Sequence, residues 1–149
     1  MGPRGKQCGK KEWRENSEIL FVCEKNSGTS QMAQAFAEKR GIKASSAGRH
    51  PTATLDPIMV QAMKESNIDI SRSKPRSLTP QIISQATLVV AIGCSFDDAC
   101  PQSMRAKMKE KTIEWDWKGL GRRRIEDARQ TRDEIERRVN DLLLQRLEQ

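Results

Sequence analysis

Cys23 lies where backbone geometry can make a thiol reactive. It ends the apolar run of residues 18–23, and the small polar residues 24–30 lead from it into a helical pattern. A loop that joins a strand to a helix points backbone N–H groups and the positive end of the helix dipole at one small volume, which stabilises a thiolate or an oxyanion. We therefore expect Cys23 to be nucleophilic and easily oxidised. A buried, inert thiol at a strand end is the alternative.

Two further cysteines have a related placement. Cys94 directly follows the apolar residues 87–93, and Cys100 comes six positions later. Because parallel strands that bind ligands do so at their carboxyl ends, Cys23 and Cys94 could meet at one edge of a sheet. Five residues separate Cys94 from Cys100, more than in zinc knuckles, and the only histidine is His50, so we expect no metal site. Ordinary burial of both thiols is the alternative.

The elements that must position these thiols follow from the hydrophobic pattern. Short continuous apolar runs predict strands that are buried on both faces, and apolar residues at spacings of three and four predict amphipathic helices. The predicted strands are residues 18–23, 42–47, 87–93 and 111–117, and the predicted helices are 32–41, 56–66, 77–85 and a long charged helix from 125 onward. Strands that alternate with helices indicate an open parallel sheet in an α/β fold.

Length and composition bound the domain organisation. The 149 residues suit one domain, and the apolar residues, although only 36% of the chain, fall in compact blocks that can form a core. We predict a single domain at residues 18–149. Residues 1–17 are rich in Gly and Lys, carry Cys8 and lack periodicity, so we expect a flexible basic extension.

Charge and cysteine content limit the cellular compartments and the kinds of partner that we expect for this protein. The chain has no long apolar run and no secretion signal at its start, so we expect a cytoplasmic protein without a membrane partner. Four cysteines then indicate reduced or transiently oxidised thiols. The net charge of +7 is spread over many segments and Tyr is absent, which does not favour nucleic-acid binding.

Several segments carry a family resemblance. Residues 19–23, the pair Asn26-Ser27 and residues 30–33 resemble the active-site loop of the low-molecular-weight protein tyrosine phosphatases, and more closely that of the thioredoxin-coupled arsenate reductases of this superfamily. Later segments agree in order and spacing, namely Ser46-Ala47-Gly48 with Pro51, and residues 62–65, 68–71, 88–90, 94–101 and 132–135. The resemblance spans about residues 18–147. It implies a flavodoxin-like three-layer α/β sandwich with a four-stranded parallel sheet.

The resemblance also implies a reaction and its residues. Cys23 would attack arsenate, Cys94 would attack the resulting adduct and expel arsenite, and Cys100 would resolve the disulfide for reduction by thioredoxin or an equivalent thiol donor. No bound cofactor is implied, and the partners would be a small oxyanion, arsenate or phosphate, and a thioredoxin-like protein, with the chain a monomer. The implied oxyanion loop is Glu24, Lys25, Asn26, Ser27, Gly28, Thr29 and Ser30. Within it, Asn26 would brace the loop and Ser30 would hydrogen-bond the Cys23 thiolate.

Two positions depart from the family pattern. Thr29 stands where the family has an arginine whose guanidinium grips the oxyanion, and one lost oxyanion donor costs about two to three powers of ten in rate. Gly119 and Leu120 stand where the family has an aspartate and a proline, the aspartate being the general acid of phosphatase chemistry. Asp116 lies three residues too early to match. Both departures count against tyrosine phosphatase activity.

Other cations are available to replace the missing arginine. They are Lys25 in the loop, Arg49 after the second strand and the triplet 122–124, although the triplet equally fits a solvated helix start. Three interpretations stay open. The chain is an arsenate reductase, an oxidoreductase with a rebuilt oxyanion site; or a degenerate thiol–disulfide redox or regulatory protein without oxyanion turnover; or a weak tyrosine phosphatase.

Overall fold

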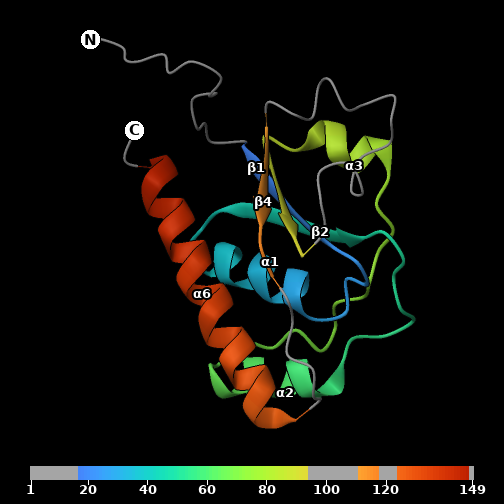
Figure 1. Cartoon of the computed structure of the whole chain (residues 1–149), viewed down its shortest axis with the longest axis vertical. Helices are drawn as coiled ribbons and strands as arrows, with labels where there is room; N and C mark the ends of the chain where they lie inside the picture. Colours follow the sequence, from blue (N-terminus) through green and yellow to red (C-terminus); the bar gives the residue numbers. More distant parts are fainter. Residues whose placement is uncertain (1–16, 94–110, 118–123, 148–149) are drawn as a thin grey trace.

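A four-stranded parallel sheet forms the centre of the protein (Figure 1). The computed structural model describes residues 17–93, 111–117 and 124–147. The strands are β1 (Glu18–Cys23), β2 (Lys43–Gly48), β3 (Leu88–Ile92) and β4 (Thr112–Trp115), in the order β2-β1-β3-β4. The central strands β1 and β3 are covered on both faces, which explains why they consist of continuous apolar runs.

Helices cover both faces of the sheet. On one face lie α1 (Thr29–Lys39), α2 (Pro57–Glu65) and the long α6 (Ile125–Leu147), and in Figure 1 α6 runs beside α1 and α2. Their core includes Phe21, Met32 and Ile135. The short α3 (Pro80–Gln85) covers the other face, where Ile83 packs with Leu20. This arrangement confirms the predicted three-layer α/β sandwich.

Element boundaries differ from the predicted ones by a few residues. The helix predicted at 77–85 begins at Pro80, because Thr79 caps it by accepting a hydrogen bond from the Ile82 N–H at 3.2 Å, and proline suits the first helical position. Helix α1 begins at Thr29, before the predicted residue 32. Thr29 and Ser30 therefore belong to the first turn of a helix. The fourth strand has four residues, Thr112–Trp115, rather than the predicted seven.

Several predicted features lie outside the described residues. These are residues 1–16 of the predicted extension with Cys8, and also Cys94, Cys100, Gly119, Leu120, Arg122 and Arg123. Ser17, the last residue of that predicted extension, is buried.

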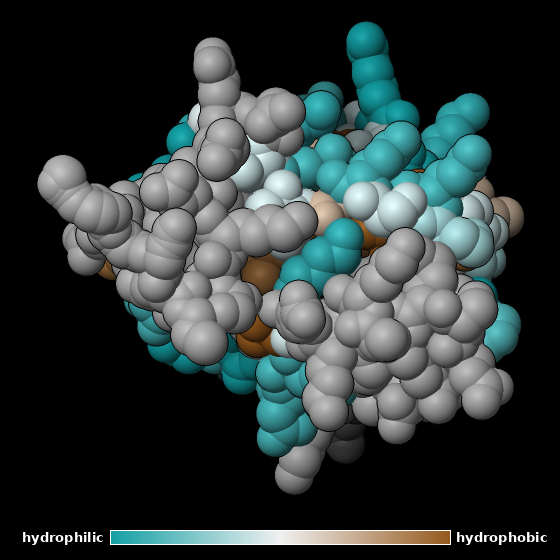
Figure 2. Space-filling model, turned by 90° about the horizontal axis from the view of Figure 1, so that it is seen from above, coloured by the Kyte–Doolittle hydropathy of each residue, from teal (hydrophilic) through white to brown (hydrophobic). Residues whose placement is uncertain are grey.

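The described surface is largely polar. On the face shown in Figure 2, the coloured residues are mostly hydrophilic, and small hydrophobic areas are visible between them. Among the described residues, Leu144 is the only large apolar side chain that is mostly exposed, at 57%. Within this part of the chain, no helix is both long and apolar enough to cross a membrane.

Candidate active site

Cys23 ends β1 as a free thiol that is only 9% exposed. Its Sγ lies 2.9 Å from Ser30 Oγ, and the Asn26 backbone N–H donates to it at 3.2 Å. A thiolate at this position would accept both hydrogen bonds, with the Ser30 hydroxyl as donor. The local geometry therefore favours the nucleophilic form of the sulfur.

The loop after Cys23 turns its backbone N–H groups inward. Four of its carbonyls point outward and accept hydrogen bonds from the neighbouring segment 49–56. These bonds run from Arg49 N to Cys23 O, from His50 N to Glu24 O, from Thr52 N to Lys25 O and from Asp56 N to Ser27 O. Because the peptide bonds are trans, the N–H that follows each carbonyl points the opposite way, towards the inside of the loop. The Asn26 N–H that reaches the sulfur is one of them.

The start of α1 adds further donors beside the loop. Gly28 is the N-cap residue and no side chain caps the helix. The first N–H groups of a helix have no acceptor within it, and they carry the positive end of the helix dipole. Gly28 also packs closely on α2, since a β carbon there would lie 2.7 Å from Met59 Cγ. This is the arrangement that binds small anions in proteins.

Asn26 holds the loop in shape. It is buried and adopts a left-handed backbone conformation, with φ of 52°, which asparagine tolerates better than most residues. Its Nδ2 donates to Ser30 Oγ at 2.7 Å, and its Oδ1 accepts from the Arg76 backbone N–H at 2.8 Å. Asn26 therefore orients the serine that contacts Cys23 and ties the loop to a segment fifty residues away.

Gln31 and the segment around Arg76 belong to the site. Gln31 falls within the loop resemblance at residues 30–33, which implies no role for it, and no sequence feature pointed to the segment around Arg76. The buried Gln31 Nε2 donates to Asn26 O, to Asn26 Oδ1 and to Lys74 O, at 3.3, 3.0 and 3.2 Å. The signal available for Gln31 is a polar residue on the buried side of an amphipathic helix. Residues 72–77 are polar and lack periodicity, so nothing local marked their contact with the loop.

Three ionisable side chains meet at the rim of the loop. Glu24 accepts a hydrogen bond from Arg49 Nη1 at 3.1 Å, and its other oxygen lies 2.6 Å from His50 Nδ1. The hydrogen bond from His50 lowers the pKa of Glu24 below its ordinary value, and the charge of Arg49 acts in the same direction. Lys25, the other cation near the loop, is exposed and has no ion pair with any described residue.

The other predicted residues that the structure describes do not bond to the loop. Thr29 is half-buried in the first turn of α1 and has no guanidinium to offer. Asp116 is exposed, and its backbone carbonyl accepts from Arg138 at 3.0 Å. Arg124 is exposed and lies 3.7 Å from Asp127 in α6, as expected for a solvated helix start.

The end of β3 brings the chain close to Cys23 again. β3 is hydrogen-bonded to β1 in parallel, with Ala91 opposite Val22. Gly93, the residue before Cys94, has a φ of 73° and donates to Trp115 O at 3.0 Å. Cys23 and Gly93, the residue that precedes Cys94, therefore lie at the same end of the sheet, where the parallel strands β1 and β3 have their carboxyl ends.

No group of three metal-ligating side chains occurs within the part of the chain that the structure describes.

Comparisons with known proteins agree with this geometry. Residues 18–149 match the family described as low molecular weight phosphotyrosine protein phosphatase. Arsenate reductase 1 of Staphylococcus haemolyticus is 31% identical over 126 residues, which cover 83% of this chain and 92% of that protein. Arsenate reductase 1 of Staphylococcus saprophyticus is 32% identical over 120 residues, which cover 78% and 88%.

Solved structures show the same fold with two kinds of activity. A thioredoxin-dependent arsenate reductase from Corynebacterium glutamicum has a TM-score of 0.72 and 27% identity, with 89% of this chain and 63% of that chain covered. The YwlE arginine phosphatase from Geobacillus stearothermophilus has a TM-score of 0.70 and 26% identity, with 89% and 96% covered.

Proposed function

Because this chain belongs to the low molecular weight phosphotyrosine protein phosphatase family, we propose that it reduces arsenate to arsenite with Cys23 as the nucleophile. The observation that carries the proposal is the Cys23 thiol, held by Ser30 and the Asn26 N–H inside a loop of inward-facing N–H groups. The relatives named arsenate reductase, matched over most of their length, favour this reaction over phosphate-ester hydrolysis.

The proposed reaction begins with an S–As bond. The Cys23 thiolate attacks arsenic, and an arsenate oxygen leaves as water. The Cys94 thiolate then attacks Cys23 Sγ, forming a Cys23–Cys94 disulfide while the S–As bond breaks. The electron pair of that bond stays on arsenic, which is reduced from As(V) to As(III) and leaves as arsenite. The position of Gly93 at the edge of the sheet that Cys23 occupies supports this step.

The third proposed thiol regenerates the nucleophile. Cys100 attacks Cys94, so that the disulfide moves to Cys94–Cys100 and Cys23 returns as a thiolate. A thioredoxin-like dithiol then reduces Cys94–Cys100 and becomes a disulfide itself, which balances the two electrons that arsenate took up. The cysteines carry all the electrons, so the proposal includes no bound cofactor. It places the protein in a reducing cytoplasm as a monomer.

We propose that Arg49 grips the oxyanion in place of the missing loop arginine. Its backbone N–H donates to Cys23 O, so its side chain starts beside the loop. Its only described side-chain bond is through Nη1 to Glu24, which leaves Nε and Nη2 for an anion. A guanidinium can bind an oxyanion through two parallel hydrogen bonds, which the ammonium of Lys25 cannot do. On binding, Arg49 would exchange its Glu24 partner for the oxyanion.

Thr29 favours a second candidate function. Without the loop arginine, the protein could exchange electrons between Cys23 and protein thiols and turn over no oxyanion. Tyrosine phosphatase activity fits less well, because Gly119 stands where the family has its general acid and Asp116 makes no described bond to the loop.

One assay separates these functions. The reduced protein is mixed with arsenate, thioredoxin, thioredoxin reductase and NADPH, and NADPH oxidation is followed. We expect turnover that is abolished in Cys23→Ser and kept in Cys8→Ser, since Cys8 has no part in the proposed relay. Absence of Cys23-dependent turnover contradicts arsenate reduction. If peptide mapping of that protein after oxidation still finds disulfides among Cys23, Cys94 and Cys100, the second candidate is favoured.

A further inference from the structure

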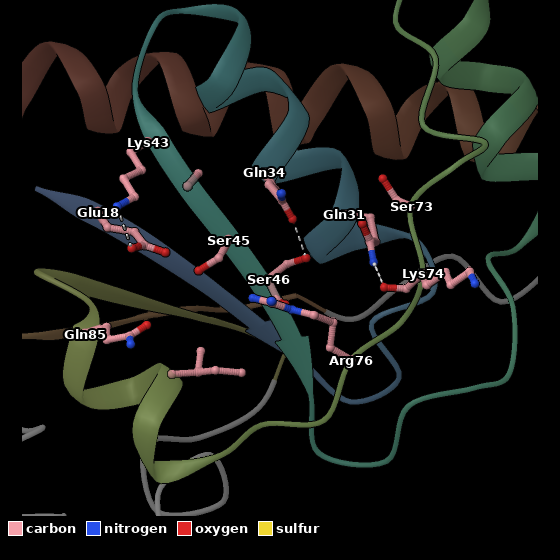
Figure 3. A pocket seen from close by; sticks show the side chains of 12 residues that line it. Glu18, Gln31, Gln34, Lys43, Ser45, Ser46, Ser73, Lys74, Arg76 and Gln85 are labelled. Carbon is pink, nitrogen blue, oxygen red and sulfur yellow. Dashed lines mark hydrogen bonds and ion pairs between the residues drawn. The ribbon is translucent and has the colours of Figure 1, made fainter. Parts of the chain in front are cut away.

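A groove of about 460 Å³ lies along the free edge of β2 (Figure 3), and Cys23 is not among the residues that line it. Its walls come from β2, from α1, from α3 and from the segment 73–76. The lining residues that matter here are Gln31, Lys43, Ser45, Ser46, Lys74 and Arg76. Its volume is in the range of small-molecule binding sites.

The strand edge in the groove offers backbone donors. At the end of β2, Gly48 donates to Arg76 O at 2.8 Å and accepts from Leu78 N at 3.0 Å, so both its polar groups face away from β1. Residues at alternate positions of a strand face the same way, so the N–H groups of Ser46 and Ala44 also face the groove. No strand covers this part of the edge within the described residues.

The groove carries an excess of positive charge. Lys43, Lys74 and Arg76 line it, against one carboxylate, Glu18, which lies 3.8 Å from the Lys43 ammonium. The structure, over the residues it describes, places no carboxylate within ion-pair distance of Lys74 or Arg76. Among the described residues, the Arg76 side chain bonds only through Nε, which donates to Ser46 O at 3.2 Å. The rest of its guanidinium is free to bind an anion.

The buried hydroxyl of Ser45 in the groove wall has no hydrogen-bond partner among the described residues. Ser45 is 8% exposed, and its Oγ makes no hydrogen bond with any described residue. Buried polar groups in proteins nearly always have a partner, so an exception calls for an explanation. A bound molecule with a hydrogen-bonding group next to β2 would provide that partner.

We propose that the β2 groove binds a small organic anion. Its carboxylate or phosphate group pairs with Arg76, and its body lies along the strand edge, where the Ser46 N–H and the Ser45 hydroxyl bind it. The Lys74 side chain points away from Arg76 (Figure 3) and adds only to the positive charge around the groove. The binding site does not depend on arsenate reduction.

A chain of hydrogen bonds through Asn26 connects the groove to the thiol. Lys74 O accepts from Gln31, which also binds Asn26, and the Arg76 N–H donates to Asn26 Oδ1. Asn26 in turn holds Ser30 and reaches Cys23 Sγ. An anion that moves Arg76 therefore shifts Asn26 and the hydrogen bonds that Cys23 Sγ receives, so its binding alters the rate at which Cys23 is alkylated.

The test is an NMR titration of the reduced full chain at constant ionic strength. Citrate probes a polycarboxylate and glycerol 3-phosphate a phosphate monoester. We expect saturable shifts of the amide signals of Ser45, Ser46 and Lys74 with at least one of them. Arg76→Gln should weaken this binding about tenfold, since a charge-assisted hydrogen bond is lost. The control Arg72→Gln removes the same charge from an exposed neighbour outside the groove and should leave affinity unchanged.

Two results overturn the proposal. One is that shifts occur only at residues 24–30, which would mean that the anions bind in the Cys23 loop alone. The other is that Arg72→Gln weakens binding as much as Arg76→Gln, which would reduce the effect to general charge. If only citrate or only glycerol 3-phosphate gives Arg76-dependent shifts, the proposal stands and that probe identifies the acidic group.

Discussion

Gly48 and Asn26 lie so close that a β carbon on Gly48 would be 2.9 Å from both the backbone nitrogen and the Cβ of Asn26. We therefore expect Gly48→Ala to push the loop outward. Overpacking of this kind costs about 1–3 kcal/mol of unfolding free energy. The shift should also disturb the Asn26 N–H that reaches Cys23 Sγ, so alkylation of Cys23 by iodoacetamide, followed by mass spectrometry, should slow.

Gly41→Ala is the matched control for this prediction. Gly41 has a φ of 82°, and a β carbon added there would meet no atom of the described residues within 4 Å, so alanine is strained without touching the loop. It should lower stability in urea unfolding and leave the alkylation rate of Cys23 unchanged. Equal alkylation rates in the two variants would contradict the role given to Gly48.

Asn26→Ala should lower the free energy of unfolding by more than the strain of a left-handed backbone alone explains. Asn26 and Asn67 both have positive φ, at 52° and 64°, but only Asn26 is buried and bonded to Ser30, Gln31 and the Arg76 N–H. We expect about 1 kcal/mol of destabilisation for Asn67→Ala, from backbone strain. Asn26→Ala should add about 1–3 kcal/mol, because it leaves buried groups without partners.

The alkylation rate of Cys23 distinguishes the roles of Asn26 and Asn67 further. Loss of the oriented Ser30 hydroxyl in Asn26→Ala should slow Cys23 alkylation about tenfold, the factor that one lost hydrogen bond to a charged group implies. Asn67→Ala should not change that rate. A variant that is destabilised but alkylates at the normal rate would show that Asn26 supports the fold and not the thiol.

These contacts mark the boundary of what the sequence could predict. The strands at 18–23 and 87–93 were predictable because both are buried on two faces and so consist of continuous apolar residues. The loop start at Cys23 was predictable because it follows the end of such a run. Each of these signals is local, and so was the proline at position 80 that could have placed the start of α3.

The bracing of the loop was not predictable in the same way. Asn26 bonds to the Arg76 N–H across fifty positions of chain, and Gly48 pairs with Ser77 through a single bridge. The polar segment that supplies these groups has no hydrophobic period, so its extended course depends on tertiary contacts. The Glu24–Arg49–His50 contact likewise arises because the fold brings residues 24 and 49 to one edge of the sheet.

Glu134 gives a pH-dependent prediction. Hydrogen bonds from Arg137 and then Arg138 lower its pKa from 4.5 to about 2. Since the pKa is lower in the folded state, the carboxylate stabilises the protein fully above pH 4.5, and that contribution is lost as the pH falls from 4.5 towards 2. The side chain is partly exposed, so solvent screening limits the contribution to about 0.2–1 kcal/mol.

Urea unfolding between pH 6 and pH 2 measures this contribution, provided that the variant is compared with the normal protein at each pH. Glu134→Gln should be less stable at pH 6, and the two stabilities should converge as the pH approaches 2. Glu136→Gln, on the same helix and without an ion pair among the described residues, is the control for replacing a glutamate by glutamine in this helix. A constant difference for Glu134→Gln would contradict the ion-pair assignment.

Arg49 provides the sharpest test of the proposed oxyanion grip. Phosphate, which has the shape and charge of arsenate but cannot be reduced, serves as the ligand in a calorimetric titration. Arg49→Gln should weaken phosphate binding about tenfold or more, because a charged bidentate donor is lost. Glu24→Gln should strengthen phosphate binding, since Arg49 then no longer has to give up an ion pair with Glu24 when the anion binds. Lys25→Gln removes an equal charge from the loop and should have the smaller effect.

Thr29→Arg tests whether an arginine at position 29 and Arg49 bind the oxyanion in the same way. If they do, Thr29→Arg restores phosphate binding in the Arg49→Gln background and makes Arg49 dispensable, so the effects of the two substitutions are not additive. Additive effects would show instead that the two positions contribute to phosphate binding independently, and Arg49 would then not take the place of the loop arginine. If neither the normal protein nor Thr29→Arg binds phosphate, the loop itself does not hold oxyanions. Cys23 would then act only on protein thiols.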